Sequence, residues 1–184
     1  MSTVVEEESR DAFDEADPEF WDEAAELSVS SIYALSRSIA VATGLQNMQS
    51  QLDHAINLIN KGVDGEDIWI FNWRILGATS FVAGINSGVF PEDLNPIDIF
   101  TRVLVSKQHD YGPENIARFG RIGLLVRLHD KIARLDNLSR RGVEPKNESL
   151  RDNYMDVINY CAIGMMLERE WFFLDLKEEK NENY

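Results

Sequence analysis

The segment from Asp64 to Gly88, DGEDIWIFNWRILGATSFVAGINSG, constrains the fold most strongly, because its apolar residues continue around every side of a helix. An element that is apolar on all sides must be covered on all sides. The segment starts with a helix-cap signal, and its length favours a helix, although periodicity alone does not separate a buried helix from a buried strand. We therefore expect a fully buried helix here.

The rest of the chain is rich in helix boundaries and poor in strand boundaries. Asp17-Pro18 and Asn95-Pro96 each pair a capping residue with a proline that suits the first helical position, and Gly62 and Gly142 are typical stops. Five further helices are predicted, from Asp17 toward Gly44, Gln46 to Lys61, Asn95 to Tyr111, Glu114 to Arg140 and Glu148 past Trp171. The prediction is one all-α domain of about six helices over residues 17–176, with a flexible acidic tail over 1–16 and a charged tail over 177–184.

The composition is that of a soluble globular protein, with 44% hydrophobic and 27% charged residues. The single cysteine, Cys161, excludes an internal disulfide and fits a reducing compartment. No apolar run reaches the roughly 18 residues of a membrane span, and the N-terminus lacks a signal-peptide pattern. We expect a cytoplasmic protein, located in the host cytoplasm if a phage encodes it.

The net charge of −14 is concentrated at the N-terminus, where eleven acidic residues and one basic residue, Arg10, precede Leu27. One interpretation is a solvated tail, and another is a mimic of nucleic-acid charge that occupies a basic partner. Because carboxylates and phosphates repel each other, direct binding to nucleic acid is not expected.

A charged pair lies at the end of the helix predicted from Asn95. Ile97, Phe100, Val103 and Leu104 form its apolar stripe; Lys107 falls inside that stripe and Asp110 at its edge. A lysine in such a place must reach outward to solvent or find an anion. The alternatives are a local Lys107–Asp110 pair and an anion bound from elsewhere.

The helix predicted from Glu114 has a basic side. Its apolar face comprises Ile122, Leu125, Leu128, Ile132 and Leu135. Arg127, Asp130, Lys131 and Arg134 lie opposite, in line with Gly120 and Gly123, which suggests close approach by a backbone or a ligand. Three cations on one stripe suit phosphate oxygens, while the alternative is a solvent-exposed face or salt bridges to a neighbouring helix.

The last long helix carries acids at i, i+4 and i+8, which are Glu148, Asp152 and Asp156. Its core stripe lies almost opposite and comprises Leu150, Tyr154, Val157, Ile158, Cys161 and Met165. The acidic face continues through Asn159, Ile163 and Met166, which are poor choices for open water. We therefore expect this helix to be covered on both sides, with its carboxylates beside a cleft or an interface.

Carboxylates on adjacent turns are typical ligands of Mg²⁺. Glu148 and Asp156 are separated by roughly 12 Å along the helix axis, so Asp152 and Asp156 are the better candidates for one ion. Glu148 would favour the helix N-terminus or serve a second ion. The competing interpretation is that Arg127, Lys131 and Arg134 neutralise these acids directly.

Three stretches, KQHDYGPENIARFG, VRLHDKIARLDNL and NESLRDNYMDVINY, together resemble the phage-encoded family called nucleotide modification associated domain 1, over roughly Asn95 to Glu170. The last stretch is also similar to the Glu-x-x-Asp helix of the all-α, MazG-like nucleoside triphosphate pyrophosphohydrolases. Those enzymes bind Mg²⁺ through helical acids and cleave between the α and β phosphates, commonly in a site between subunits. The resemblance implies Mg²⁺, or Mn²⁺, as cofactor and a homodimer as the assembly.

The resemblance also implies roles for individual residues. The metal ligands would be Asp152 and Asp156, with Glu148 as a further ligand or general base; Asp110 and Asp130 would complete the metal shell or orient the cations. Lys107 would act in catalysis, and the substrate would contact Arg127, Lys131, Arg134, Tyr111 and Asn159. MazG-like enzymes usually carry a Glu-x-x-Glu pair where this chain has Lys107-Gln-His-Asp110. Tyr111, Phe119 or Trp73 could stack on a base.

Three functions are consistent with these features. The first is Mg²⁺-dependent hydrolysis of a nucleoside triphosphate to a monophosphate and pyrophosphate. The second, suggested by the missing Glu-x-x-Glu pair, is a module that binds a nucleotide without hydrolysing it. The third is an acidic interaction protein whose N-terminal tail blocks a host factor.

Overall fold

The computed structural model describes residues 11–177, and these residues form helices and connecting loops with no strand. The helices are α1 (Ala12–Glu15), α2 (Trp21–Ser36), α3 (Leu45–Asn60), α4 (Glu66–Asn86), α5 (Ile97–Tyr111), α6 (Glu114–Ala117), α7 (Gly120–Arg141) and α8 (Leu150–Glu168), followed by the 3₁₀ helix η1 (Trp171–Phe173). The all-α class predicted from the sequence is confirmed.

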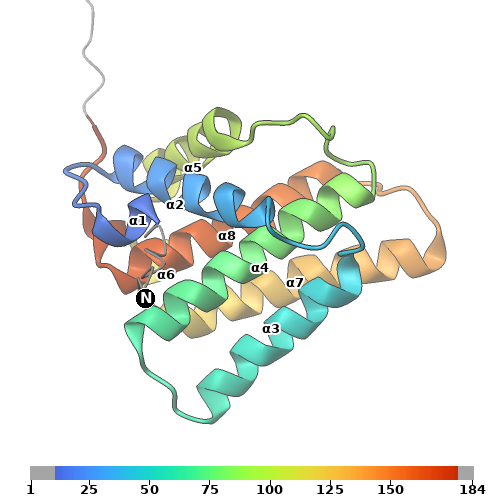
Figure 1. The fold of residues 1–184 in the computed structure, drawn as a ribbon, viewed down its shortest axis with the longest axis horizontal. Helices are drawn as coiled ribbons and strands as arrows, with labels where there is room; N and C mark the ends of the chain where they lie inside the picture. The colour runs from blue at the N-terminus through green and yellow to red at the C-terminus, as the bar shows by residue number, and fades with distance from the viewer. Residues whose placement is uncertain (1–10, 178–184) are drawn as a thin grey trace, which may run out of the picture.

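The apolar segment 64–88 forms α4, which lies in the middle of the molecule and packs against α2, α3 and α8 (Figure 1). Trp69 and Trp73 on this helix are fully buried. Gly164 on α8 lets the two helices approach closely, because a Cβ atom there would lie 2.5 Å from the Trp73 ring. The expectation of a helix rather than a strand is confirmed, but its burial is incomplete, because Ile68 and Phe71 near its start are 47% and 55% exposed.

In the part of the chain that the structure describes, α4 is also the only helix long and apolar enough to cross a membrane. It has 21 residues and a mean hydropathy of 1.3 in its most apolar window, of which 67% is buried inside the protein. Such burial is consistent with the core helix of a soluble protein.

Several helix boundaries differ from the predicted ones. Helix α2 begins at Trp21 rather than at Asp17 and ends at Ser36, well before Gly44. The helix predicted from Glu114 to Arg140 is two helices, α6 and α7, because Gly120 has a positive φ of 51° at their junction. Gly123 accommodates the side chain of Phe119 rather than a ligand. The last helix starts after Ser149 and ends at Glu168, where a left-handed Glu170 leads into η1.

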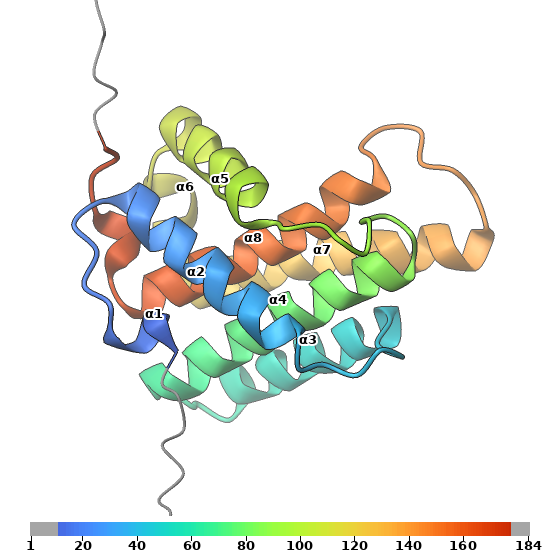
Figure 2. The ribbon, with the colours of Figure 1, turned by 45° about the horizontal axis from the view of Figure 1, so that its top comes forward.

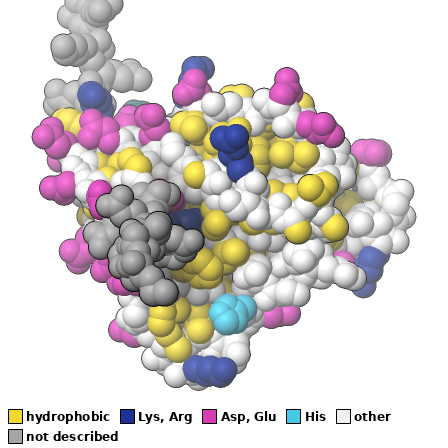
Figure 3. Space-filling view, viewed as in Figure 1, with side chains coloured by type: hydrophobic (Ala, Val, Ile, Leu, Met, Phe, Trp, Pro, Cys, Tyr) yellow, Lys and Arg dark blue, Asp and Glu magenta, His cyan; other side chains and the backbone are white. Residues whose placement is uncertain are grey.

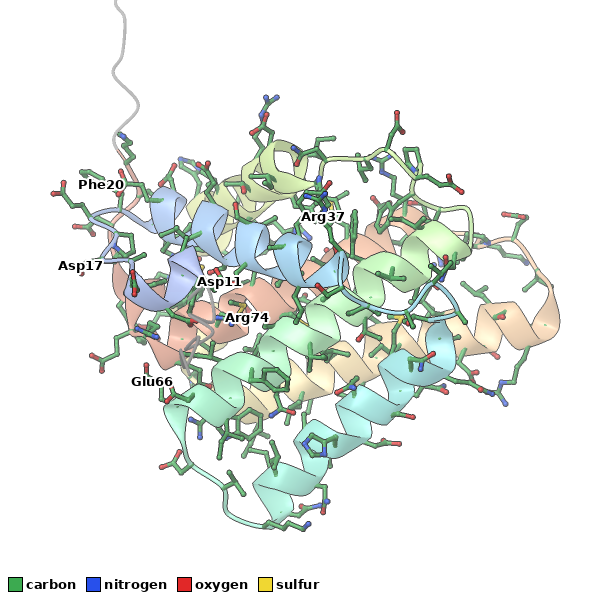
Figure 4. The ribbon with its side chains drawn as sticks, viewed as in Figure 1. Asp11, Asp17, Phe20, Arg37, Glu66 and Arg74 are labelled. Atoms are coloured by element: carbon green, nitrogen blue, oxygen red, sulfur yellow. The ribbon has the colours of Figure 1, made fainter. Side chains whose placement is uncertain are left out.

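Part of the predicted acidic tail is folded onto the domain. The Asp11 side chain caps α1 and accepts a hydrogen bond of 2.6 Å from the Ser31 hydroxyl. Phe13 is fully buried, with its ring centroid 4.7 Å from that of Trp171. Arg74 of α4 pairs with Asp14 at 2.8 Å, and the labelled side chains of Asp11 and Arg74 lie close together in Figure 4. The predictions for residues 1–10 and 178–184 concern parts of the chain outside the described residues.

Acidic side chains remain exposed near this end of the chain. Figure 3 shows them gathered at the left edge of the molecule, where α1 and the start of α2 lie in Figure 1.

The apolar faces that frame the site follow the predicted periodicity with one exception. Phe100 and Leu104 of α5 and Leu125, Leu128 and Ile132 of α7 are buried. Helix α8 is buried on both sides, as expected from its sequence. Ile122, predicted in the core face of α7, is 60% exposed instead, because at about 100° per residue it lies beyond the edge of the face formed by the buried residues of this helix.

Candidate functional site

The centre of the candidate site is Asp156 of α8, a buried carboxylate held between two lysines. Lys107 Nζ of α5 lies 2.5 Å from Asp156 Oδ1, and Lys131 Nζ of α7 lies 2.8 Å from Oδ2. Burial by itself raises the pKa of Asp156, but the hydrogen bonds and charges of the two lysines outweigh burial and lower this pKa below its ordinary value. Asp156 is therefore ionised, and each of its oxygens has a cationic partner.

Glu148, just before α8, extends this cluster. Lys131 Nζ lies 2.8 and 2.7 Å from the two Glu148 carboxylate oxygens. Arg134 donates a 2.6 Å hydrogen bond to the Glu148 backbone carbonyl. Burial lowers the pKa of Lys131, yet its bonds to Asp156 and Glu148 raise it overall. Three cations surround two carboxylates, so the cluster is net positive in a protein that is strongly acidic as a whole.

A cavity of about 360 Å³ opens beside the cluster, between α5, α6, α7, α8 and the first residue of α2. Figure 2 shows α5 and α6 on the same side of α8. The residues that line the cavity are Trp21, Leu104, Lys107, Gln108, Tyr111, Gly112, Asn115, Ile116, Arg127, Glu148, Asp156, Asn159, Tyr160 and Ile163. Its volume is in the range of small-molecule sites.

Two cations line this cavity from different helices. The Lys107 side chain is 48% exposed, so its ammonium contacts Asp156 and can still reach solvent. Arg127 donates a 2.8 Å hydrogen bond to the side-chain oxygen of Asn115, and its guanidinium lies 5.9 Å from the centroid of the Tyr160 ring. Lys107 and Arg127 thus offer positive charge to a ligand from two sides.

Most of the residues proposed from the sequence meet here. Lys107, Tyr111, Arg127, Glu148, Asp156 and Asn159 line the cavity, and Lys131 and Arg134 contact its carboxylates. The interpretation that cations neutralise the acids directly describes Lys131 and Arg134, while Arg127 bonds to Asn115 instead. Of the proposed aromatic residues, Tyr111 lines the cavity, whereas Trp73 is in the core and Phe119 points to solvent.

Three proposed acids lie elsewhere. Asp152 forms a capping box at the start of α8, accepting a 2.6 Å hydrogen bond from the Ser149 hydroxyl, and it does not line the cavity. Asp110 is exposed and pairs with the neighbouring His109 at 3.3 Å rather than with Lys107. Asp130 is exposed on α7 and does not line the cavity. The proposed metal set of Asp152, Asp156, Glu148 and Asp130 is therefore not brought together.

Among all the described residues, no three His, Cys, Asp or Glu side chains form a group that could hold a metal ion. The chemistry of Asp156 and Glu148 suits a hard cation, but lysines already bind both carboxylates. Because the cluster has a net positive charge, it favours an anion over a further cation as its next partner.

The structure adds site residues that sequence reasoning missed, notably Trp21. The backbone N–H of Trp21 donates a 2.8 Å hydrogen bond to the Asp175 carbonyl, and its ring packs edge-on against Phe172. Its indole Nε1 and both side-chain polar atoms of Asn159 are buried, with no hydrogen-bond partner among the described residues. Nothing in the local pattern around Trp21 distinguishes it from an ordinary core tryptophan.

These features define an all-α protein with a cavity that is lined by two cations and two carboxylates and lies beside a cluster of net positive charge. Residues 107–167, a third of the chain, match the family model described as nucleotide modification associated domain 1. The resemblance seen in the sequence motifs is confirmed for this segment, which indicates a nucleotide modification associated domain, whereas the similarity to MazG-like enzymes is not shown.

No curated protein and no solved structure matched the chain in the corresponding comparisons. The matched segment begins at Lys107 and contains the whole cation–carboxylate cluster. Trp21 lies outside it.

Proposed function

We propose that the cavity binds a nucleoside triphosphate, with the phosphates near Lys107 and Arg127. The observation that carries this proposal is the surplus of cations in the cluster beside the cavity, within the segment that matches a nucleotide modification associated domain. Arginine offers a planar fork to phosphate oxygens and lysine a compact charge.

We further propose that the bound nucleotide is hydrolysed to a monophosphate and pyrophosphate in the presence of Mg²⁺ or Mn²⁺. Lys131 brings the carboxylates of Asp156 and Glu148 together, so these two residues would hold the metal once phosphate oxygens take their place as partners of the lysines; alternatively, the partly exposed Glu148 would act as general base. Such an ion, when bound, neutralises phosphate charge and lowers the pKa of a water molecule. Phosphate oxygens would replace the carboxylates as partners of Lys107 and Lys131. Asp110, Asp130 and Asp152 have no role in this scheme.

The test is pyrophosphate release from a panel of ribo- and deoxyribonucleoside triphosphates with Mg²⁺. Asp156→Asn should abolish release, because the carboxylate that holds the metal and orders both lysines is lost. Asp53→Asn, on the exposed face of α3, is the matched control and should release pyrophosphate like the wild type. Release that survives Asp156→Asn would overturn the proposal of hydrolysis at this site.

The second candidate function is nucleotide binding without hydrolysis. It is favoured by the capping role of Asp152, which leaves two carboxylates rather than three beside the cavity. Binding that is lost in Lys107→Ala but kept in the exposed control Lys61→Ala, with no pyrophosphate release, would establish this function instead.

Two further proposals concern partners. A homodimer is supported by exposed apolar side chains on and just before α7, namely Phe119, Ile122 and Val126. Light scattering of the wild type and of Ile122→Glu tests it, since a monomeric wild type would exclude it.

An N-terminal segment that blocks a host factor is tested by removing residues 1–10, which spares the buried Phe13. Nucleic acid and membranes are not proposed as partners, and the cytoplasm is the proposed location.

A further inference from the structure

Arg127 differs from the other cations of the site, because it contacts no carboxylate among the described residues. Lys107 and Lys131 both contact Asp156, and Arg134 contacts the second carboxylate of the cluster. Arg127 lines the same cavity as Lys107, yet no ion pair within the described part of the chain offsets its charge.

The Arg127 guanidinium is held by neutral groups from two other helices. Its Nη2 donates a 2.8 Å hydrogen bond to Asn115 Oδ1 of α6 and a longer one, of 3.4 Å, to the backbone carbonyl of the same residue. Its centre lies 5.9 Å from the centroid of the Tyr160 ring of α8. Arginine has five N–H donors, and those on Nε and Nη1 have no partner among the described residues. The guanidinium is thus tethered through one nitrogen, while the other two can donate to a ligand.

Helix α6 places Asn115 beside Arg127. Ile116, the next residue along the chain, is 8% exposed and packs in the hydrophobic core. The backbone N–H of Ala117 donates a 2.9 Å hydrogen bond to the Pro113 carbonyl. Although the Asn115 side chain is exposed, its backbone is therefore anchored where α6 forms one wall of the cavity.

An amide suits this position for an electrostatic reason. The amide oxygen of Asn115 accepts a hydrogen bond from Arg127 and adds no charge. A carboxylate of the same size would form an ion pair with the guanidinium and so compete with an incoming anion. Asn115 therefore holds Arg127 without neutralising it.

We propose that Asn115 is a positioning residue, which presents the Arg127 guanidinium with its charge unpaired to the phosphates of the ligand. The inference rests on the proposed function, because it assumes that a triphosphate enters this cavity. The polyphosphate is the part of the ligand that this arginine binds, since a guanidinium offers several N–H groups to phosphate oxygens at once.

Isothermal titration tests the inference, with inorganic tripolyphosphate and the non-hydrolysable α,β-imido analogues of the four common deoxynucleoside triphosphates as probes. Asn115→Asp keeps the size of the side chain and pairs Arg127 with a carboxylate, so binding should weaken about tenfold or more. Asn115→Ala removes the tether without adding charge and should weaken binding about threefold. Asn57→Asp, which adds the same charge on an exposed part of α3, is the matched control and should bind like the wild type.

Two further measurements separate positioning from a merely structural role. The melting temperature of Asn115→Asp should not fall, because an ion pair replaces a hydrogen bond at an exposed site. In an Arg127→Ala background, Asn115→Asp should weaken binding much less than in the wild type, since only direct repulsion of the anion by the new carboxylate remains.

The outcomes distinguish this inference from the proposed function. Binding that depends on Lys107 but is the same in Asn115→Asp as in the wild type would overturn the role of Asn115 and leave nucleotide binding intact. An equal loss in the wild-type and Arg127→Ala backgrounds would show that Asn115 does not act through Arg127, which also overturns the inference. Failure of every probe to bind the wild type would overturn the proposed function and the inference together.

Discussion

At the scale of single residues, the side chains that contact Asp156 determine the chemistry of the site. In the sequence Asp156 is one of three acids on a helix, and its spacing from Asp152 suits a shared metal ion. In the structure it is buried and bonded to Lys107 and Lys131, which approach from two other helices. Its electrostatic surroundings, rather than its spacing from Asp152, set its chemistry.

The lowered pKa of Asp156 predicts a pH dependence of stability. An acid with a pKa below its ordinary value contributes stability that is present above that ordinary value, near 3.8, and is lost as the pH falls through the lowered pKa. Asp156→Asn should therefore reduce the free energy of unfolding at pH 7 by about 1–3 kcal/mol, and the difference from the wild type should shrink toward pH 3.

Urea unfolding of both proteins between pH 7 and pH 3 measures this effect, with Asp53→Asn as an exposed control that should follow the wild type throughout. A deficit in Asp156→Asn that stays constant down to pH 3 would contradict the ion-pair interpretation. On the alkaline side, the raised pKa of Lys131 implies stability that is present below its ordinary value and is lost as the pH rises through the raised one.

At the scale of elements, the start of α8 shows why an acid pattern alone is ambiguous. Asp152 and Ser149 form reciprocal hydrogen bonds that satisfy the first N–H groups of the helix. The sequence Asn-Glu-Ser-Leu-Arg-Asp contains this capping pattern as well as an acid spacing suited to a metal ion. In the structure Asp152 caps the helix and does not line the cavity.

The two roles of Asp152 make opposite predictions. As a cap, Asp152→Ala should lower the free energy of unfolding by about 1 kcal/mol and leave nucleotide binding intact, because the residue does not line the cavity. Ser149→Ala should have a similar effect on stability, since it breaks the same capping box. Thermal unfolding and titration with a triphosphate analogue measure both quantities. Lost binding with unchanged stability would show that Asp152 serves the site instead.

The boundary between α6 and α7 also differs from what apolar periodicity predicts. The apolar periodicity runs through residues 114–140 and predicts one helix, but Gly120 adopts a positive φ that interrupts it. On α7 itself, Ile122 is exposed, and Lys131 contacts Asp156 of α8. Periodicity identified the helical residues, but it revealed neither the break at Gly120 nor the carboxylates that the cations of α7 contact.

At the scale of the whole molecule, two opposite electrostatic features coexist. The chain carries a net charge of −14, with exposed acids around α1 and α2, while the cavity lies beside a cluster with more cations than carboxylates. An acidic surface disfavours the approach of polyanions, whereas a recessed cluster of net positive charge favours a small anion at short range.

This arrangement predicts an order of binding. Mg²⁺ alone should give no stoichiometric binding, because Asp156 and Glu148 already hold lysines and a further cation would meet net positive charge. With a non-hydrolysable triphosphate present, the added negative charge should allow one or more ions to bind. Calorimetric titration of Mg²⁺ with and without the analogue measures this. Tight Mg²⁺ binding to the free protein that Asp156→Asn removes would contradict the proposed order.

The sequence by itself determined the helical class, the buried position of α4 and the apolar stripes of α5 and α8, because caps and periodicity act between residues a few positions apart. It also brought Lys107, Lys131, Glu148 and Asp156 together as candidates. Only the tertiary structure decided that Lys107 and Lys131 share Asp156, and that Trp21 reaches the same cavity. These contacts join helices far apart in the chain, so they depend on how the helices pack and rotate, and no local pattern encodes that.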